Sequence, residues 1–119
     1  MEIEGRESVS LPSFQVTGNL VDPLAGRISP ATVEVDSGRI ARIVHGRGES
    51  PEYLLPGFVD AHVHIESSML LPSRFAAAAV VHGTVATVSD PHEIANVLGA
   101  EGVRFMLEDA AGSPLKISF

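Results

Sequence analysis

An alternating stretch at residues 56–68 constrains the fold of this chain more than any other feature of its sequence. Read as a β-strand, the stretch places successive side chains on opposite faces. One face is wholly apolar and consists of Val59, Ala61, Val63 and Ile65. The other face holds only residue types that bind metal ions, namely Asp60, His62, His64 and Glu66. The pattern therefore predicts a strand with one face against a core and the other available for a site.

The two histidines of the polar face have the spacing needed to share one metal ion. Residues two apart on a strand point the same way, with Cα atoms about 6.5–7 Å apart, so both rings can reach an ion over bonds of about 2.0–2.1 Å. The other interpretation is a half-buried strand whose polar face meets water, and two arbitrary histidines would favour it. Because the face also carries carboxylates and follows the Pro56-Gly57 break, we favour His62 and His64 as metal ligands.

The composition limits what kind of site the chain can hold. The chain has 119 residues and no cysteine, which excludes a disulfide framework and a thiolate metal site. A net charge of −7 argues against a nucleic-acid partner. The longest apolar run, at residues 75–81, is too short to span a bilayer, so we expect no membrane partner and a cytoplasmic location. The 45% hydrophobic content is high for a small chain and suggests elements buried on both faces, as in a larger α/β body.

The first half of the chain reads as a small β subdomain that follows a polar lead-in. Strands are predicted at residues 13–22, 30–36 and 39–44, and Asp22-Pro23 opens a turn after the first. The pair Ser37-Gly38 between the second and third strands is typical of a hairpin. We read these strands as scaffold and His45, in its glycine-rich loop, as a solvated residue without a function.

After Pro56 the pattern changes to strands that alternate with helices. A helix is predicted to begin at Pro72, which suits a first turn, and to end at His82-Gly83, with His82 near the helix terminus rather than on a metal. Strands follow at residues 84–89 and 115–119, with a longer amphipathic helix at about 100–111 between them. This alternation implies a parallel sheet with right-handed crossovers.

A second polar group follows the strand at residues 84–89. Asp90 as N-cap with Pro91 and Glu93 in the first turn would make a capping box, which explains both carboxylates structurally but leaves His92 unexplained. In parallel α/β folds chemistry collects at the carboxyl ends of the strands. Asp90 and His92 are therefore expected to open onto the same rim as His62, which strengthens the prediction of a site.

The run Pro56-Gly57-Phe58-Val59-Asp60-Ala61-His62-Val63-His64 resembles the first-strand signature of the amidohydrolase superfamily. Those enzymes pair a metal-bearing (β/α)8 barrel with a small β-sandwich built partly from N-terminal strands. The resemblance implies an α/β fold with residues 1–13 as a lead-in, 14–55 as a partial β-sandwich and 56–119 as the first three strands of an incomplete (β/α)8 (TIM-like) barrel with their helices. A full barrel needs about 250 residues, so we expect the N-terminal part of a longer protein.

Two further segments narrow the resemblance. Ile65-Glu66-Ser67-Ser68-Met69 and Ser89-Asp90-Pro91-His92-Glu93-Ile94-Ala95-Asn96-Val97 are similar to segments of the adenine deaminases, a bacterial and archaeal family built on this barrel. That family implies hydrolysis of adenine to hypoxanthine and ammonia at a divalent metal centre, usually manganese or iron and sometimes zinc. The partner is then a small purine substrate, and we expect a homo-oligomer when the protein is full length.

The resemblance also assigns roles to residues. His62 and His64 become metal ligands, and Asp60 supports one of them from behind. The remaining assignments are candidates: Asp60 and Glu66 for catalysis, Asp90 and His92 as further ligands, and Glu93 and Ser67 for substrate contacts. The ion would supply hydroxide for attack on C6 of the purine while a carboxylate moves a proton to the departing amine. Later strands would supply the remaining ligands, so we expect the 119-residue chain alone to be inactive.

Two alternatives stay open. The first is another amidohydrolase, such as a cyclic amidase or a deacetylase, against which the Glu-Ser-Ser and Asp-Pro-His-Glu motifs count. The second is a non-catalytic metal-binding or assembly module, which the short chain would suit and which should be stable and monodisperse alone. The barrel interpretation instead predicts an exposed sheet edge at residues 115–119.

Overall fold

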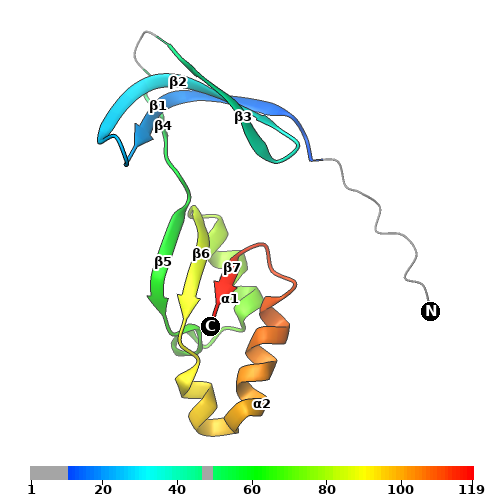
Figure 1. Cartoon of the computed structure of the whole chain (residues 1–119). Helices are drawn as coiled ribbons and strands as arrows, with labels where there is room; N and C mark the ends of the chain where they lie inside the picture. The colour runs from blue at the N-terminus through cyan, green and yellow to red at the C-terminus, as the bar shows by residue number, and fades with distance from the viewer. Residues whose placement is uncertain (1–10, 47–49) are drawn as a thin grey trace, which may run out of the picture. The chain divides into compact units, whose positions relative to one another are not determined.

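The computed structural model describes residues 11–46 and 50–119 (Figure 1). The predicted lead-in lies mostly outside the described residues. Contacts divide the chain into two compact units, Met1–Pro56 and Gly57–Phe119. Among the described residues no helix combines the length and apolar character needed to cross a bilayer.

The first unit contains one four-stranded sheet in the order β3-β2-β1-β4. Its strands are β1 (Phe14–Asp22), β2 (Arg27–Asp36), β3 (Arg39–His45) and β4 (Tyr53–Leu54). The first three pair antiparallel, which confirms the hairpin predicted for β2 and β3, and β4 runs parallel to β1. The turn between β2 and β3 has positive φ at Ser37 (51°) and Gly38 (73°), the conformation of a two-residue hairpin loop.

β2 begins earlier than the sequence predicts. The Asp22 carboxylate closes the preceding turn by accepting hydrogen bonds from the backbone N–H groups of Leu24 (3.1 Å) and Ala25 (2.9 Å). Strand pairing with β1 can therefore resume at Arg27, which lies opposite Asp22. Pro30, which suggests a strand start because it lacks an N–H donor, instead lies inside the strand.

The sheet of the first unit has one apolar face. Val16, Val33 and Ile43 lie beside one another across β1, β2 and β3, and a groove of about 580 Å³ lies on this side. Ile40, which also lines the groove, is 65% exposed. A β-sandwich needs a second sheet against such a face. The described residues of this unit form one sheet, so the sandwich remains a prediction.

The second unit is built on a three-stranded parallel sheet in the order β5-β6-β7 (Figure 1). Its elements are β5 (Phe58–Val63), the 3-10 helix η1 (Ile65–Ser68), α1 (Pro72–Val80), β6 (Thr84–Ser89), α2 (His92–Ala110) and β7 (Lys116–Ser118). This confirms the alternation of strands and helices and a mixed α/β fold. The outermost position of β7 agrees with the predicted sheet edge, whereas closure into a barrel remains a prediction.

Local signals set the bounds of the helices. Pro72 occupies the first position of α1, and Gly83 after the helix has a φ of 89°, which a residue with a side chain rarely adopts. Gly99, at φ 63° and ψ −149°, divides α2 into two helical segments. The second segment is the predicted helix at residues 100–111. Ile65, Ala76, Met106 and Leu115 are the buried hydrophobic side chains of this unit.

The predicted strand around the histidines extends too far. β5 ends at Val63, and the chain then turns into η1, so Ile65 and Glu66 do not continue the two faces of the strand. The turn buries Ile65 completely and is held by hydrogen bonds from Ser67 N to His64 O (3.2 Å) and from the Ser68 hydroxyl to Ile65 O (2.6 Å). Serine hydroxyls compete for backbone groups in this way and favour turns over strands.

The predicted capping box is also wrong. α2 begins at His92 with Pro91 in the N-cap position, and this residue has no side chain that can cap the helix. Asp90 instead accepts a hydrogen bond from the His92 ring, and Glu93 accepts one from Ser67. Both carboxylates therefore have side-chain partners instead of the capping partners that the pattern predicts.

Candidate metal centre

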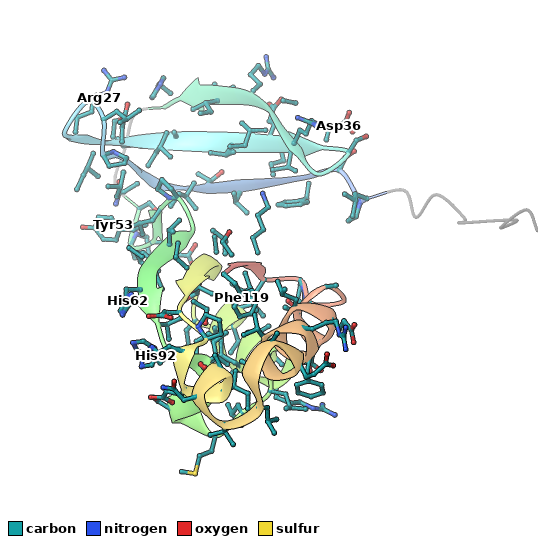
Figure 2. The ribbon with its side chains drawn as sticks, turned by 60° about the horizontal axis from the view of Figure 1, so that its bottom comes forward. Arg27, Asp36, Tyr53, His62, His92 and Phe119 are labelled. Atoms are coloured by element: carbon teal, nitrogen blue, oxygen red, sulfur yellow. The ribbon has the colours of Figure 1, made fainter. Side chains whose placement is uncertain are left out.

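The candidate residues lie at the carboxyl ends of two neighbouring parallel strands. β5 carries Asp60 and His62, and His64 follows its last residue; Asp90 follows β6, and His92 begins α2. A hydrogen bond from Asp90 N to Val63 O (3.1 Å) holds the two strand ends together. Figure 2 shows His62 and His92 on the same side of the second unit. The sheet thus brings both predicted polar groups to one rim.

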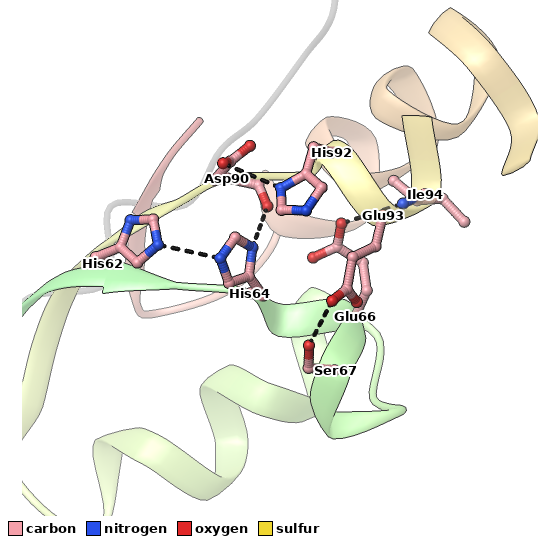
Figure 3. Close-up of polar contacts among 8 residues, drawn as sticks. All are labelled: His62, His64, Glu66, Ser67, Asp90, His92, Glu93 and Ile94. Atoms are coloured by element: carbon pink, nitrogen blue, oxygen red, sulfur yellow. Dashed lines mark hydrogen bonds and ion pairs between the residues drawn. The ribbon is translucent and has the colours of Figure 1, made fainter. Parts of the chain in front are cut away.

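His62 and His64 face one another as ligands of one ion would. Their Nε2 atoms lie 3.0 Å apart, and their rings meet edge to face with centroids 4.7 Å apart (Figure 3). Two ring nitrogens bound to one ion at right angles, with bonds of about 2.1 Å, would be separated by about 3.0 Å. The separation of the two nitrogens therefore fits a shared metal ion.

The orientation of His64 is fixed from behind. Its Nδ1 lies 2.9 Å from the backbone oxygen of Asp90. Because a carbonyl oxygen only accepts hydrogen bonds, Nδ1 must carry the hydrogen, which leaves the lone pair on Nε2, the atom that faces His62. Metal-binding histidines are commonly oriented by such a bond on the second nitrogen.

Asp90 and His92 complete the cluster. Potential ligand atoms of His64, Asp90 and His92 all lie within 4.8 Å of one another, and the rings of His64 and His92 are 4.7 Å apart. His92 Nδ1 donates to Asp90 Oδ2 at 3.1 Å, and this bond is the main cause that holds the pKa of Asp90 below its ordinary value. The electrostatic influence of His92 and His64 also lowers this pKa, so Asp90 is ionised at neutral pH. One carboxylate among imidazoles is a donor set suited to manganese, iron or zinc.

The other candidate residues have different partners. Asp60 Oδ1 accepts a hydrogen bond from the backbone N–H of His62 (3.1 Å), which ties this carboxylate to the strand. Ser67 Oγ donates to Glu93 Oε1 at 2.8 Å (Figure 3). Glu66 Oε1 accepts from the backbone N–H of Ile94 at 3.3 Å, and its buried Oε2 has no hydrogen-bond partner among the described residues. The Ile94 contact was missed because a backbone donor leaves no signal in the residue type.

The fold and the cluster together define a class. Histidines and a carboxylate gathered at the carboxyl ends of parallel strands are typical of α/β enzymes that use a metal ion. The comparison with known families agrees, because the model of the Amidohydrolase family matches residues 53–119. The chain belongs to the amidohydrolase family.

Three curated relatives show how far the similarity extends. A protein named adenine deaminase from Salinibacter ruber is 59% identical over 107 residues, which cover 90% of this chain and 20% of that protein. Proteins of the same name from Methanothermobacter thermautotrophicus (54% over 104 residues, 87% and 19%) and Borreliella burgdorferi (48% over 106 residues, 89% and 19%) are also similar. The chain thus spans about a fifth of the length of the curated relatives that it matches.

Proposed function

We propose that this chain is the N-terminal part of an adenine deaminase. Such an enzyme adds water to C6 of adenine and releases hypoxanthine and ammonia. The observation that carries the proposal is the facing pair His62 and His64, with Nε2 atoms 3.0 Å apart, at a rim that also holds Asp90 and His92. Relatives that carry this name, at 48–59% identity, support the choice of substrate within the family.

The proposed metal ligands in this chain are His62, His64, Asp90 and His92. Their nitrogen and oxygen donors fit manganese or iron, with zinc as the alternative, and the absence of cysteine from the chain is consistent with this donor set. When bound, such an ion lowers the pKa of a coordinated water and supplies hydroxide near neutral pH. The residues themselves orient the donors: Asp90 holds His64 through its backbone oxygen and His92 through its carboxylate.

Asp60 and Glu66 are the candidate carboxylates for proton handling and support. Asp60 is bonded to the His62 backbone, which favours a role in holding that strand end over a role in proton transfer. Glu66 has one buried oxygen without a described partner, which favours it as the acceptor. We further propose that residues 14–55 contribute to a β-sandwich and β5, β6 and β7 to a barrel, and that the full-length protein is a cytoplasmic homo-oligomer that binds no nucleic acid.

Adenine turnover by the full-length parent protein tests the proposal. Protein stripped of metal and reloaded with Mn²⁺ should convert adenine to hypoxanthine with equimolar ammonia, measured by chromatography and an ammonia assay. Hydantoins and acylated amino sugars should not react. Preference for one of those substrates over adenine would assign the chain to another amidohydrolase and refute the proposal.

A matched pair of variants tests the ligands. His62→Ala combined with His64→Ala should lose bound metal, measured by elemental analysis after gel filtration. His82→Ala removes an exposed histidine that precedes β6, at the opposite end of that strand, and should keep the full metal content. Unchanged metal content in the double variant would exclude His62 and His64 as ligands.

A further inference from the structure

Two glutamates cross between η1 and the first turn of α2 in a reciprocal pattern. Glu93 on α2 accepts a hydrogen bond from the Ser67 hydroxyl on η1 at 2.8 Å. Glu66 on η1 accepts one from the backbone N–H of Ile94 on α2 at 3.3 Å. Each glutamate thus reaches the residue that follows the other glutamate, and Figure 3 shows the two side chains between their elements. We call Glu66, Ser67 and Glu93 the η1–α2 clamp.

The clamp joins the two segments that carry the candidate ligands. His64 is the residue immediately before η1, and His92 is the first residue of α2. Both histidines lie beyond the last residues of β5 and β6, so the ladder of the sheet does not fix their separation. Their rings nevertheless lie 4.7 Å apart. Asp90 contacts both rings, and the bonds that hold η1 against α2 add a second constraint on their spacing through the backbone.

We propose that the η1–α2 clamp positions His64 and His92 for metal binding, and that Ser67 and Glu93 neither bind the ion nor contact the substrate. The inference rests on the proposed function, because it concerns the same site. Ser67 and Glu93 are bonded to each other, which leaves these side chains occupied without any ligand. Neither is part of the cluster whose ligand atoms lie within 4.8 Å of one another. Partners bonded directly to metal ligands typically change metal affinity by about 10–100-fold when they are lost, and the clamp, which acts through the backbone, is expected at the lower end of this range.

The 3-10 helix η1 has anchors other than the Ser67 bond. η1 is anchored by Ile65, which is completely buried, and by its own backbone hydrogen bonds. Ser67 is exposed, and its hydroxyl bond to Glu93 lies at the surface. Loss of this bond is therefore expected to lower metal affinity while leaving the metal-free protein folded. A general structural role would instead lower the melting temperature of the metal-free protein.

Mn²⁺ affinity of the full-length parent protein tests the clamp. Metal-free protein is titrated with Mn²⁺, and the Kd is measured by calorimetry and by the electron paramagnetic resonance signal of free Mn²⁺. Ser67→Ala and Glu93→Ala should each raise the Kd about tenfold or more. The Kd of the double variant should not exceed that of the weaker-binding single variant, because either change alone already removes the same hydrogen bond. Glu93→Gln should retain most of the affinity, since its amide oxygen still accepts from Ser67.

Ser68→Ala is the matched control. Ser68 lies in the same helix, but its hydroxyl bonds to Ile65 O within η1 instead of reaching α2, so its loss should leave the Kd unchanged. Equal affinity in Ser67→Ala, Glu93→Ala and wild type would overturn the proposal. The proposal would also be overturned if Glu93→Gln bound Mn²⁺ as weakly as Glu93→Ala, because the carboxylate of Glu93 would then bind the ion itself. A raised KM for adenine at unchanged Kd for Mn²⁺ would overturn it as well, because it would indicate a substrate contact. Failure of the proposed function differs, because wild-type protein would then bind Mn²⁺ without deaminating adenine.

Discussion

Asp109 caps a helix to which it does not belong, and its removal gives the sharpest test of the packing. The N-cap residue of α1, Leu71, has no side chain that can accept a hydrogen bond. Asp109, near the end of α2, supplies the acceptor: Oδ2 lies 2.7 Å from the backbone nitrogen of Ser73 and Oδ1 lies 3.1 Å from its hydroxyl. The carboxylate also places negative charge at the positive end of α1.

The magnitude follows from the kind of bonds that are lost. Hydrogen bonds to charged groups contribute about 1.5–3 kcal/mol, and replacing a capping side chain by alanine costs about 0.5–2 kcal/mol. We expect Asp109→Ala to lower the free energy of opening α1 by about 2 kcal/mol, which corresponds to roughly 30-fold faster amide exchange where opening is local. Asp109→Asn keeps one acceptor oxygen and should have a smaller effect.

Hydrogen exchange followed by mass spectrometry on the full-length protein measures this effect. Peptides that contain Ser73 should exchange faster in Asp109→Ala, while β5 and β6 change less. Glu108→Ala is the control, because Glu108 is exposed and only approaches Arg104 at 3.9 Å, which predicts a change below about 0.5 kcal/mol. Equal exchange of α1 in the two variants would refute the capping role of Asp109.

Two other predictions concern backbone strain and surface charge. Gly99→Ala should destabilise the second unit by about 1–3 kcal/mol, measured by thermal unfolding, because φ 63° with ψ −149° is open essentially to glycine alone. The half-buried Glu34 accepts two hydrogen bonds from Arg42, which lower its pKa, so Arg42→Ala should raise the pKa of Glu34 in an NMR titration. The stabilising contribution of this pair is present above the unfolded-state pKa of Glu34 and is lost as the pH falls through its lowered folded-state value.

Much of the second unit could be predicted because its signals are local. Pro72 begins α1 as predicted, and Gly83 with its positive φ follows the helix. The helix itself ends at Val80, two residues before the predicted His82. The facing of His62 and His64 follows in the same way from the two-residue repeat of a strand.

Two wrong predictions, the length of β5 and the capping box, arise where contacts between residues distant in sequence decide the local structure. Alternation continues through Glu66, but it cannot reveal that the chain leaves the strand at Val63 and buries Ile65 by turning. The capping box failed because Ser67, far away in sequence, takes the carboxylate of Glu93. Contacts of this kind depend on which strands are neighbours, which no local pattern contains.

The apolar composition of the chain is understandable from β5, the strand that carries the site, because many of its apolar side chains are exposed. Both faces of β5 are open in the described structure, with Phe58 57% and Val59 63% exposed, although the sequence predicts Val59 to face a core. Apolar strand residues left open in this way favour association with further strands. Relatives about five times as long have further segments available for that cover. The side chains of Asp90 and His92 are likewise about half exposed, at 50% and 55%. Cover over this rim would exclude water and strengthen the electrostatic interactions between charged groups in the site, which is why the metal-binding and deamination tests belong in the full-length protein.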